Sequence, residues 1–315
     1  MKACLICCQP LDVGESTYHE KCSAELFGSR SLPSLRYSWS DLNKLAEQVI
    51  LRRVAVPGVQ PKLSLHLERN GISRGGRLTL VGLEGEFILK PPTVEYPAMP
   101  EFEHYTMRLA RAAGLDVVRC GLIPLASGEL AYITHRMDRT RVGPLHVEDV
   151  CQLTDKLTEQ KYRGSMEQVG KAVLHYSSNP GFDAVRLFEL TLFCYLTGNA
   201  DMHLKNFSLL YEADGAIWLS PAYDLLPTKL FIPQDQEESA LTINGKKSRL
   251  QRIDFDAFGR SMKLTERQIS NTHTRLQKNM AKALSEVSQV FIRGERKAAL
   301  KSLLRVRMAR LWGAK

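Results

Sequence analysis

The spacing of the apolar residues changes part-way along the chain, and this change restricts the fold more than any other feature. Before about residue 139 they form mostly short alternating stretches divided by Pro and Gly turns, with helical patterns over 40–53 and 102–115. From about residue 146 helical spacing dominates, interrupted by a strand pair over 207–220 that turns at Asp214-Gly215. Strands followed by helices predict an α+β fold with a β-rich first lobe and an α-helical second lobe.

The pattern divides the chain into three regions. We expect a Cys-rich head over 1–30, a β-rich lobe over 31–142 and an α-helical lobe over 143–315. Residues 40–53 are predicted to form a helix with Ser40 as its N-cap, and 146–157 a further helix. A chain of 315 residues, 44% of them hydrophobic, is long enough to bury a sizeable core.

The composition favours a cytoplasmic protein with acidic partners. There is no window of about 18 apolar residues and no cationic leader followed by a long apolar run, so we expect no membrane contact and no signal peptide. The net charge of +9 attracts nucleotides, nucleic acids or acidic protein surfaces. Much of it lies in 293–315, which is predicted to be an amphipathic helix with a solvated basic face, with nucleic-acid contact as the alternative.

Residues suited to phosphoryl transfer occur in a consistent order. This chemistry needs a lysine for nucleotide phosphates, an aspartate for the attacking hydroxyl, oxygen ligands for Mg²⁺ and a loop over the phosphates. Lys90 ends an apolar strand pattern, and 56–64 is a turn that could cover a nucleotide. Asp201 follows a long apolar helix pattern, and Asn206 comes five residues later, the spacing of the protein-kinase loop H-R-D-x-x-x-x-N. A hairpin over 207–220 would return Asp224 to the same metal.

Taken singly, each of these residues also has a purely structural explanation. A lysine after a strand is usually solvated, Asp201 and Asn206 are suited to capping turns, and Pro and Gly mark any hairpin. Their order, the lobe that carries each of them, and the spacing of Asp201 and Asn206 favour the functional interpretation.

Six motifs fall in one order between about residues 50 and 270: GVQPKLSL, FILKP, HRMDR, HVEDVCQ, NADMHLKNFSLL and PAYDLL. Together they resemble the HipA family of serine/threonine kinase toxins from bacterial toxin–antitoxin systems. The chain begins close to the Cys-rich head, without the preceding β-rich subdomain of long HipA proteins. In this it resembles HipT, the short kinase of three-component HipBST systems, in which the missing piece is a separate protein, HipS.

The resemblance implies a two-lobed, protein-kinase-like fold that uses ATP and Mg²⁺. It makes Asp201 the catalytic base, Asn206 and Asp224 the Mg²⁺ ligands, and Lys90 the phosphate-binding lysine. The same catalytic-loop motif includes His203 and Lys205, of which Lys205 would steady the transferred phosphate. The remaining nucleotide-binding residues that it implies lie in the covering loop and the interlobe segment: Ala55, Val56, Pro57, Gly58, Val59, Gln60, Lys62, His135 and Met137.

Position 55 departs from the family pattern. In the family a serine just before the covering loop is autophosphorylated and switches the kinase off, whereas this chain carries Ala55, and Pro57 stands at the second position where HipT has serine. Alanine has no hydroxyl to phosphorylate. The chain therefore lacks this switch, uses another hydroxyl such as Ser64, or has been altered at position 55.

The resemblance also implies a substrate and partners. The target would be an aminoacyl-tRNA synthetase, with the tryptophanyl enzyme favoured over the glutamyl enzyme, so that phosphorylation halts translation and growth. A small HipS-like antitoxin and a DNA-binding HipB-like antitoxin would be partners, with DNA contacted only through the antitoxin. Two alternatives stay open: a small-molecule kinase of related fold, and a non-catalytic module whose head and basic terminal helix bind nucleic acid.

The first 22 residues hold four of the seven cysteines. Cys4 and Cys7 form one pair and His19 and Cys22 another, with ligand types and spacing that suit tetrahedral Zn²⁺ in a small knuckle. Cys8 would be left over. The alternative is a reduced Cys-rich turn without metal, packed on the β-rich lobe. The other cysteines lie in apolar segments and are expected to be reduced core thiols.

Overall fold

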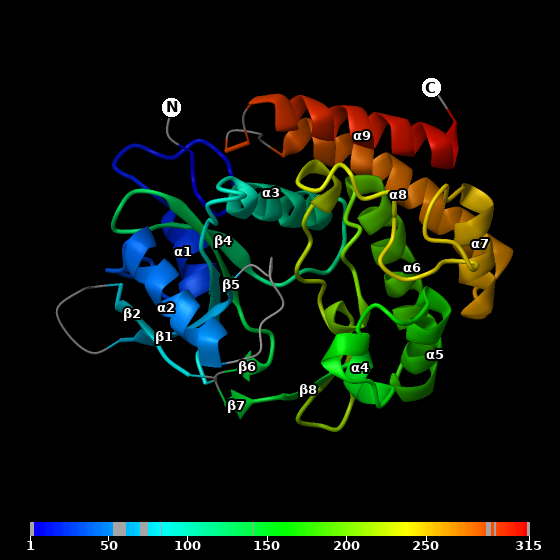
Figure 1. The fold of residues 1–315 in the computed structure, drawn as a ribbon, viewed down its shortest axis with the longest axis horizontal. Helices are drawn as coiled ribbons and strands as arrows, with labels where there is room; N and C mark the ends of the chain where they lie inside the picture. The colour runs from blue at the N-terminus through cyan, green and yellow to red at the C-terminus, as the bar shows by residue number, and fades with distance from the viewer. Residues whose placement is uncertain are drawn as a thin grey trace. The chain divides into compact units, whose positions relative to one another are not determined.

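The computed structural model describes residues 3–52, 61–69, 75–82, 84–140, 142–287, 291–292 and 294–313, and of residues 46–52 it describes the backbone alone. The chain divides into two compact units. The first comprises Met1–Tyr105, Val118–Arg136 and Ser288–Ile292, and the second comprises Thr106–Val117, Met137–Val287 and Arg293–Lys315. Figure 1 labels the elements of both units.

A five-stranded antiparallel sheet forms the centre of the first unit, in the order β2-β1-β3-β5-β4 (Figure 1). Its strands are β1 Leu63–Glu68, β2 Arg77–Leu80, β3 Phe87–Lys90, β4 Cys120–Pro124 and β5 Leu130–His135. Alternate residues of β1 face the core, as the leucines of LSLHLE predict. The alternating apolar spacing predicts strands within 77–92, 117–125 and 130–139, and the structure confirms them. It also predicts a strand at 54–56 and a turn at Asn70-Gly71, which lie outside the described residues.

Three helices begin in the first unit: α1 Glu20–Phe27, α2 Trp39–Arg52 and α3 Met99–Ala112. Phe27 of α1 packs against Phe87 of β3, with ring centroids 5.6 Å apart, so the Cys-rich head shares the core of the sheet. The predicted N-cap Ser40 is wrong, because α2 begins earlier. Ser38 caps it instead, since its Oγ accepts from the Asp41 backbone N–H at 3.2 Å while the Asp41 carboxylate accepts from the Ser38 N–H at 2.9 Å.

The second unit is built around one buried helix, α6 Pro180–Thr197, against which four other helices pack (Figure 1). These four are α5 Met166–Tyr176, α7 Arg252–Ser261, α8 Glu266–Glu286 and α9 Gly294–Trp312. Asn179 caps α6 and Pro180 stands in its first turn, a start signal that places the helix a few residues before the apolar run. From Ala184 onward almost every α6 residue is buried, which explains why the run is apolar on all sides.

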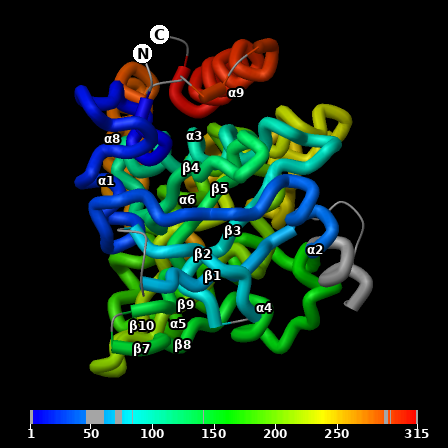
Figure 2. The backbone as a smooth tube through the Cα atoms, turned by 90° about the vertical axis from the view of Figure 1, so that its left-hand side faces the viewer, coloured from blue at the N-terminus to red at the C-terminus, as the bar shows by residue number. Residues whose placement is uncertain are grey.

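A three-stranded sheet, β8-β9-β10, also belongs to the second unit (Figure 2). The hairpin of β9 Ser208–Tyr211 and β10 Ile217–Leu219, with Gly215 at φ 88°, confirms the predicted strand pair. The helix predicted over 146–157 is wrong at both ends. Residues His146–Asp149 form β8, which pairs with β9, and only Val150–Leu153 forms a helix, α4. Pairing with a distant strand has overridden the local helical pattern.

Short elements complete the described chain. They are β6 Arg139–Thr140, β7 Gly143–Pro144, and the 3₁₀ turns η1 Thr158–Gln160, η2 Leu204–Asn206 and η3 Thr228–Leu230. Within the described ranges, no helix combines the length and the apolar character that crossing a membrane requires.

The basic C-terminal helix is less solvated than its sequence predicts. Leu300, Leu304 and Leu311 of α9 are buried as expected, but so is Arg307. The Arg307 guanidinium lies 4.7 Å from the centre of the Tyr195 ring and donates to the Tyr195 carbonyl. One of the positive charges near the C-terminus, the Arg307 guanidinium, therefore packs α9 against α6 and does not face solvent.

Candidate active site

The predicted catalytic loop leaves the core where α6 ends. Gly198 adopts φ 77° and closes the helix by donating its N–H to the Tyr195 carbonyl at 3.1 Å, a left-handed cap that turns the chain sharply. Of the next residues, Asp201 is exposed, whereas Asn199, Ala200 and Met202 around it are buried. The buried residues on either side of Asp201 therefore anchor the loop in the core, and the Asp201 carboxylate is exposed to solvent.

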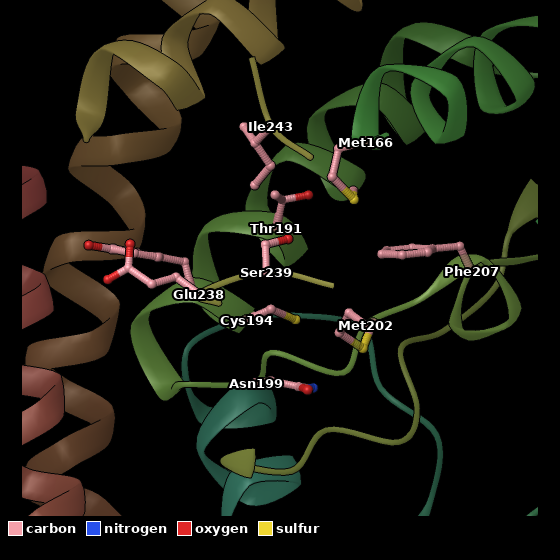
Figure 3. A pocket seen from close by; sticks show the side chains of 10 residues that line it. Met166, Thr191, Cys194, Asn199, Met202, Phe207, Glu238, Ser239 and Ile243 are labelled. Carbon is pink, nitrogen blue, oxygen red and sulfur yellow. The ribbon is translucent and has the colours of Figure 1, made fainter. Parts of the chain in front are cut away.

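A small pocket behind the loop is lined by residues of α6 and of the loop itself. The side chains of Cys194, Met202 and Phe207 converge on it (Figure 3). It has room for about one water molecule, so it cannot be the binding site of a nucleotide. Its lining also includes Met166, Glu238, Ser239 and Ile243, so residues from several parts of the second unit pack behind the loop.

The Asp201 carboxylate is held from the side by a tyrosine. The Tyr162 hydroxyl donates to Asp201 Oδ1 at 2.7 Å, and its ring meets the His203 ring edge-on, with centroids 5.2 Å apart. Partial burial, followed by this contact with a carboxylate, raises the pKa of Tyr162, so the phenol stays a proton donor at neutral pH. Sequence reasoning missed Tyr162, because nothing in its local pattern connects it with a loop 39 residues away.

Asn206 is fixed so that its amide oxygen is the atom left for a cation. Its Nδ2 donates to the Asp201 carbonyl at 3.0 Å, which closes the loop from its second end. The side chain is buried to 6% exposure, within the 3₁₀ turn η2. An amide oxygen in a defined position is a ligand type that Mg²⁺ accepts.

The hairpin that follows brings Asp224 back toward the loop. Ser220 donates its backbone N–H to the Ser208 carbonyl at 2.9 Å, and the Tyr223 hydroxyl donates to the Lys205 carbonyl at 2.8 Å. Asp224 itself has φ 60°, the left-handed region that non-glycine residues seldom occupy. Such a conformation persists only where the surroundings impose it, and it is concentrated at functional sites.

Lys205 ties the loop to the start of α4. Its Nζ donates to Asp149 Oδ2 at 2.6 Å. Asp149 also caps α4: its Oδ1 accepts from the Gln152 N–H at 3.0 Å, while Gln152 Oε1 accepts from the Asp149 N–H at 2.9 Å. The HVEDVCQ motif is thus a structural partner of the catalytic loop, which the sequence did not reveal.

In the first unit, the predicted phosphate-binding lysine is buried and paired. Lys90, at the end of β3, is 4% exposed, and its Nζ lies 2.5 Å from Oε1 of Glu103, which is 1% exposed. The ammonium also lies 5.4 Å from the centre of the Tyr132 ring. This excludes the alternative of an ordinary solvated lysine. Glu103 was missed, although a glutamate amid the buried positions of a helix is a signal for a buried charge pair.

The other predicted nucleotide residues are only partly described. His135 ends β5, with its ring edge-on to Phe87 at 5.2 Å, and Met137 is the first residue of the next segment of the second unit. Lys62 is exposed and lies just before β1. The rest of the predicted covering loop lies outside the described residues: Ala55, Val56, Pro57, Gly58, Val59 and Gln60.

The predicted zinc ligands Cys4, Cys7, His19 and Cys22 lie together in the head of the first unit. All seven cysteines are free thiols, and Cys120, Cys151 and Cys194 are buried as expected.

Comparison with known proteins gives consistent relatives. The chain is 31% identical over 260 residues to "Putative kinase Y4mE" of Sinorhizobium fredii, covering 76% of this chain and 59% of that protein. It is 26% identical over 269 residues to the serine/threonine-protein kinase toxin HipA of Shewanella oneidensis, covering 75% and 57%. The chain thus spans little more than half the length of these curated relatives.

Solved structures support the fold class. The HipA chain in a complex of Shewanella oneidensis HipA, HipB and operator DNA superposes with a TM-score of 0.68 at 23% identity, covering 85% of this chain and 71% of that one. The predicted two-lobed, kinase-like α+β fold is therefore confirmed. The family model described as the HipA-like C-terminal domain matches residues 54–284, a range that includes Lys90, the whole catalytic loop and Asp224. This chain belongs to the family of HipA-like C-terminal domains.

Proposed function

We propose that the chain is an ATP- and Mg²⁺-dependent protein serine/threonine kinase that acts as the toxin of a toxin–antitoxin module. One observation carries the proposal: an exposed Asp201 stands at the end of a buried helix, with Asn206 locked to its backbone and Asp224 returned by a hairpin. Membership of the HipA-like family and the similarity to kinase relatives support it.

In this proposal the second unit supplies the reacting centre. Asp201 accepts a hydrogen bond from the substrate hydroxyl, directs its oxygen at the γ-phosphorus and takes its proton. Tyr162 occupies one carboxylate oxygen and so restricts the rotation of the side chain, leaving Oδ2 for the hydroxyl. Asn206 and Asp224 would hold Mg²⁺ through oxygen atoms, and the ion would supply positive charge opposite the phosphates.

Most of the proposed nucleotide contacts belong to the first unit, and Met137 belongs to the second. Lys90 holds the ATP phosphates, and Glu103 keeps its ammonium in position, the role that a helix glutamate has in protein kinases. The loop 55–62 covers the phosphates, and His135 and Met137 flank the adenine. Lys205, which is paired with Asp149, steadies the transferred phosphate. His203 belongs to the same catalytic loop.

The substrate and partners follow by analogy with relatives. We infer that the target is an aminoacyl-tRNA synthetase, with the tryptophanyl enzyme first and the glutamyl enzyme second, and that the chain is closest to HipT. The structural relative was solved with HipB and operator DNA, which supports a DNA-binding HipB-like antitoxin. The HipS-like antitoxin rests on the resemblance to HipT alone. DNA is then contacted through the antitoxin, in the cytoplasm.

The test is transfer of label from γ-labelled ATP with Mg²⁺ to purified tryptophanyl- and glutamyl-tRNA synthetases. Asp201→Asn keeps the size of the side chain but removes the proton acceptor, so we expect label on one synthetase to fall at least a hundredfold with ATP affinity within a few fold. Glu212→Gln is the matched control, because Glu212 is an exposed acid at the end of the hairpin strand β9.

Each outcome decides between readings. Equal transfer by Asp201→Asn and the control would refute the role of Asp201. Label on a small metabolite but on neither synthetase would favour a small-molecule kinase. ATP binding without any transfer, together with salt-dependent DNA binding by the isolated chain, would favour the non-catalytic module.

A further inference from the structure

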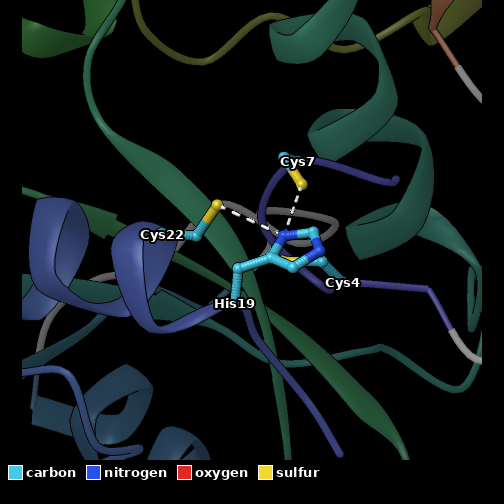
Figure 4. A group of neighbouring side chains, drawn as sticks. All are labelled: Cys4, Cys7, His19 and Cys22. Carbon is cyan, nitrogen blue, oxygen red and sulfur yellow. Dashed lines mark hydrogen bonds between the residues drawn. The ribbon is translucent and has the colours of Figure 1, made fainter. Parts of the chain in front are cut away.

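The head of the first unit gathers four metal-binding side chains that the proposed kinase reaction does not use. One sulfur or nitrogen atom from each of Cys4, Cys7, His19 and Cys22 lies within 4.8 Å of the others. Figure 4 shows the three cysteines arranged around the His19 ring. In a tetrahedral zinc site with bonds of about 2.0–2.3 Å, ligand atoms are separated by roughly 3.5–3.8 Å. Small rotations of these side chains are enough to reach that geometry.

The orientation of His19 selects the nitrogen that a metal needs. Its Nε2 lies 2.9 Å from the Pro10 carbonyl oxygen, which can only accept, so Nε2 carries the proton. The lone pair is then on Nδ1, which lies 3.2 Å from Cys7 Sγ and 3.7 Å from Cys22 Sγ. A backbone carbonyl that fixes the tautomer of a histidine ligand is the usual outer contact of zinc-bound histidine.

The turn around Cys4 is shaped to hold a thiolate. The Ile6 backbone N–H points at Cys4 Sγ over 3.5 Å, and Cys8 donates its N–H to the Cys4 carbonyl at 2.9 Å. Cys8 has φ 64°, so the chain reverses directly after the second cysteine of the pair.

A second group of ligand types shares His19 but fits a metal less well. Asp12, Glu15 and His19 also lie within 4.8 Å of one another. The nitrogen nearest Glu15 is Nε2, at 3.8 Å, and this atom already donates to Pro10. Asp12 is exposed, and the Glu15 carboxylate accepts from the backbone N–H groups of Asp12 and Glu20. Glu15 is thus committed to closing the turn.

We propose that Cys4, Cys7, His19 and Cys22 bind one structural Zn²⁺ ion. Three soft sulfur ligands and one imidazole in a tetrahedral arrangement select zinc among the common divalent ions. With four protein ligands the coordination is complete, so the ion stabilises the fold and takes no part in chemistry.

The ion would anchor the head to the edge strand β4. Leu122 donates its backbone N–H to the Leu5 carbonyl at 2.8 Å, and the Tyr18 hydroxyl donates to the Leu122 carbonyl at 2.6 Å. Leu5 lies between two of the ligands and Tyr18 immediately precedes a third. At Gly121, a Cβ atom would come within 2.8 Å of Ile6, so the strand and the ligand loop are in direct contact. Covering an edge strand in this way also protects it from pairing with other chains.

The test measures zinc in protein purified without chelator and without added metal. Elemental analysis should find one zinc per chain, and replacement by Co²⁺ should give the absorption bands of a tetrahedral cobalt thiolate. Both signals should be lost in Cys22→Ser and kept in Cys8→Ser, a matched control because Cys8 adjoins the ligands but is not one of them. Removal of zinc from the unmodified chain by a strong chelator should lower its melting temperature.

Two results would overturn the proposal. One is zinc far below one per chain combined with no cobalt bands after reconstitution of the unmodified chain. The other is a purified chain in which two of the three cysteines form a disulfide and no metal is bound. Cobalt reconstitution of the unmodified chain decides the question even if Cys22→Ser fails to fold. None of these measurements uses ATP, so the metal site and the kinase activity are tested separately.

Discussion

Replacing Glu103 by glutamine tests whether the buried ion pair with Lys90 stabilises the first unit. Both side chains are almost inaccessible, at 1% and 4% exposure, so solvent cannot compensate the charge that Glu103→Gln leaves on Lys90. Breaking a buried pair from one side costs roughly 3–5 kcal/mol, which corresponds to a melting-temperature decrease of roughly 6–20 °C.

Glu101→Gln is the matched control, because Glu101 lies two residues earlier on the same helix and burial raises its pKa to about 7. Glu101→Gln breaks no ion pair and removes a carboxyl whose ionised form is disfavoured by burial, so it should not lower the melting temperature at pH 7. The assay is thermal unfolding followed by circular dichroism, with ATP affinity measured by calorimetry. Adding Lys90→Met to Glu103→Gln should restore part of the lost stability, because the uncompensated ammonium is then gone, while ATP affinity stays low.

A melting temperature for Glu103→Gln equal to that of Glu101→Gln would refute this reasoning. So would a double variant less stable than Glu103→Gln alone, because it would show that the ammonium is stabilised by something other than Glu103.

Three further predictions concern other residues. Tyr162→Phe removes the hydrogen bond to Asp201. Because Tyr162 is 44% exposed, we expect the activation free energy to rise by only about 1 kcal/mol. Steady-state assays should then show a roughly fivefold lower kcat and an unchanged KM for ATP. Burial raises the pKa of Glu101 from its ordinary 4.5 to about 7 in the folded state, so the folded chain holds this proton more tightly than the unfolded chain. The free energy of unfolding should therefore fall by roughly 2–3 kcal/mol as the pH rises from 4.5 through 7. Urea titrations of Glu101→Gln should show no such pH dependence. Ser64 should carry no phosphate in peptide mass maps after ATP incubation, because its Oγ accepts from the Gly85 N–H at 3.1 Å within β1.

The sequence predicted best what depends on local periodicity. The buried helix α6, the Asp214-Gly215 hairpin and the division into strands and helices are all recorded in apolar spacing and turn residues. It failed at His146–Asp149, where HVED has no strong strand pattern and becomes a strand because β9 offers it a partner.

The side chains around the candidate site show the same division. The spacing of Asp201 and Asn206 is visible in a single stretch, whereas their supports are remote: Tyr162 and Asp149 reach the loop from 39 and 56 residues away. Contacts across such distances are fixed by tertiary packing, which one sequence does not reveal. Arg307 is a comparable case, since its helical position predicts a basic surface and its burial depends on the Tyr195 ring.

The buried pair of Lys90 and Glu103 in the first unit precedes the proposed reacting residues of the second unit along the chain, and this has a consequence for synthesis. Lys90 and Glu103 are 13 residues apart, whereas the reacting residues extend to Asp224. The roughly 120 residues between Glu103 and Asp224 take about 6–24 s to make at about 5–20 residues per second. A nascent chain therefore contains Lys90 and Glu103 well before it contains Asn206 and Asp224, the proposed metal ligands. If the protein does arrest translation, it can do so only after the ribosome has synthesised Asp224, so an incomplete chain cannot stop its own synthesis.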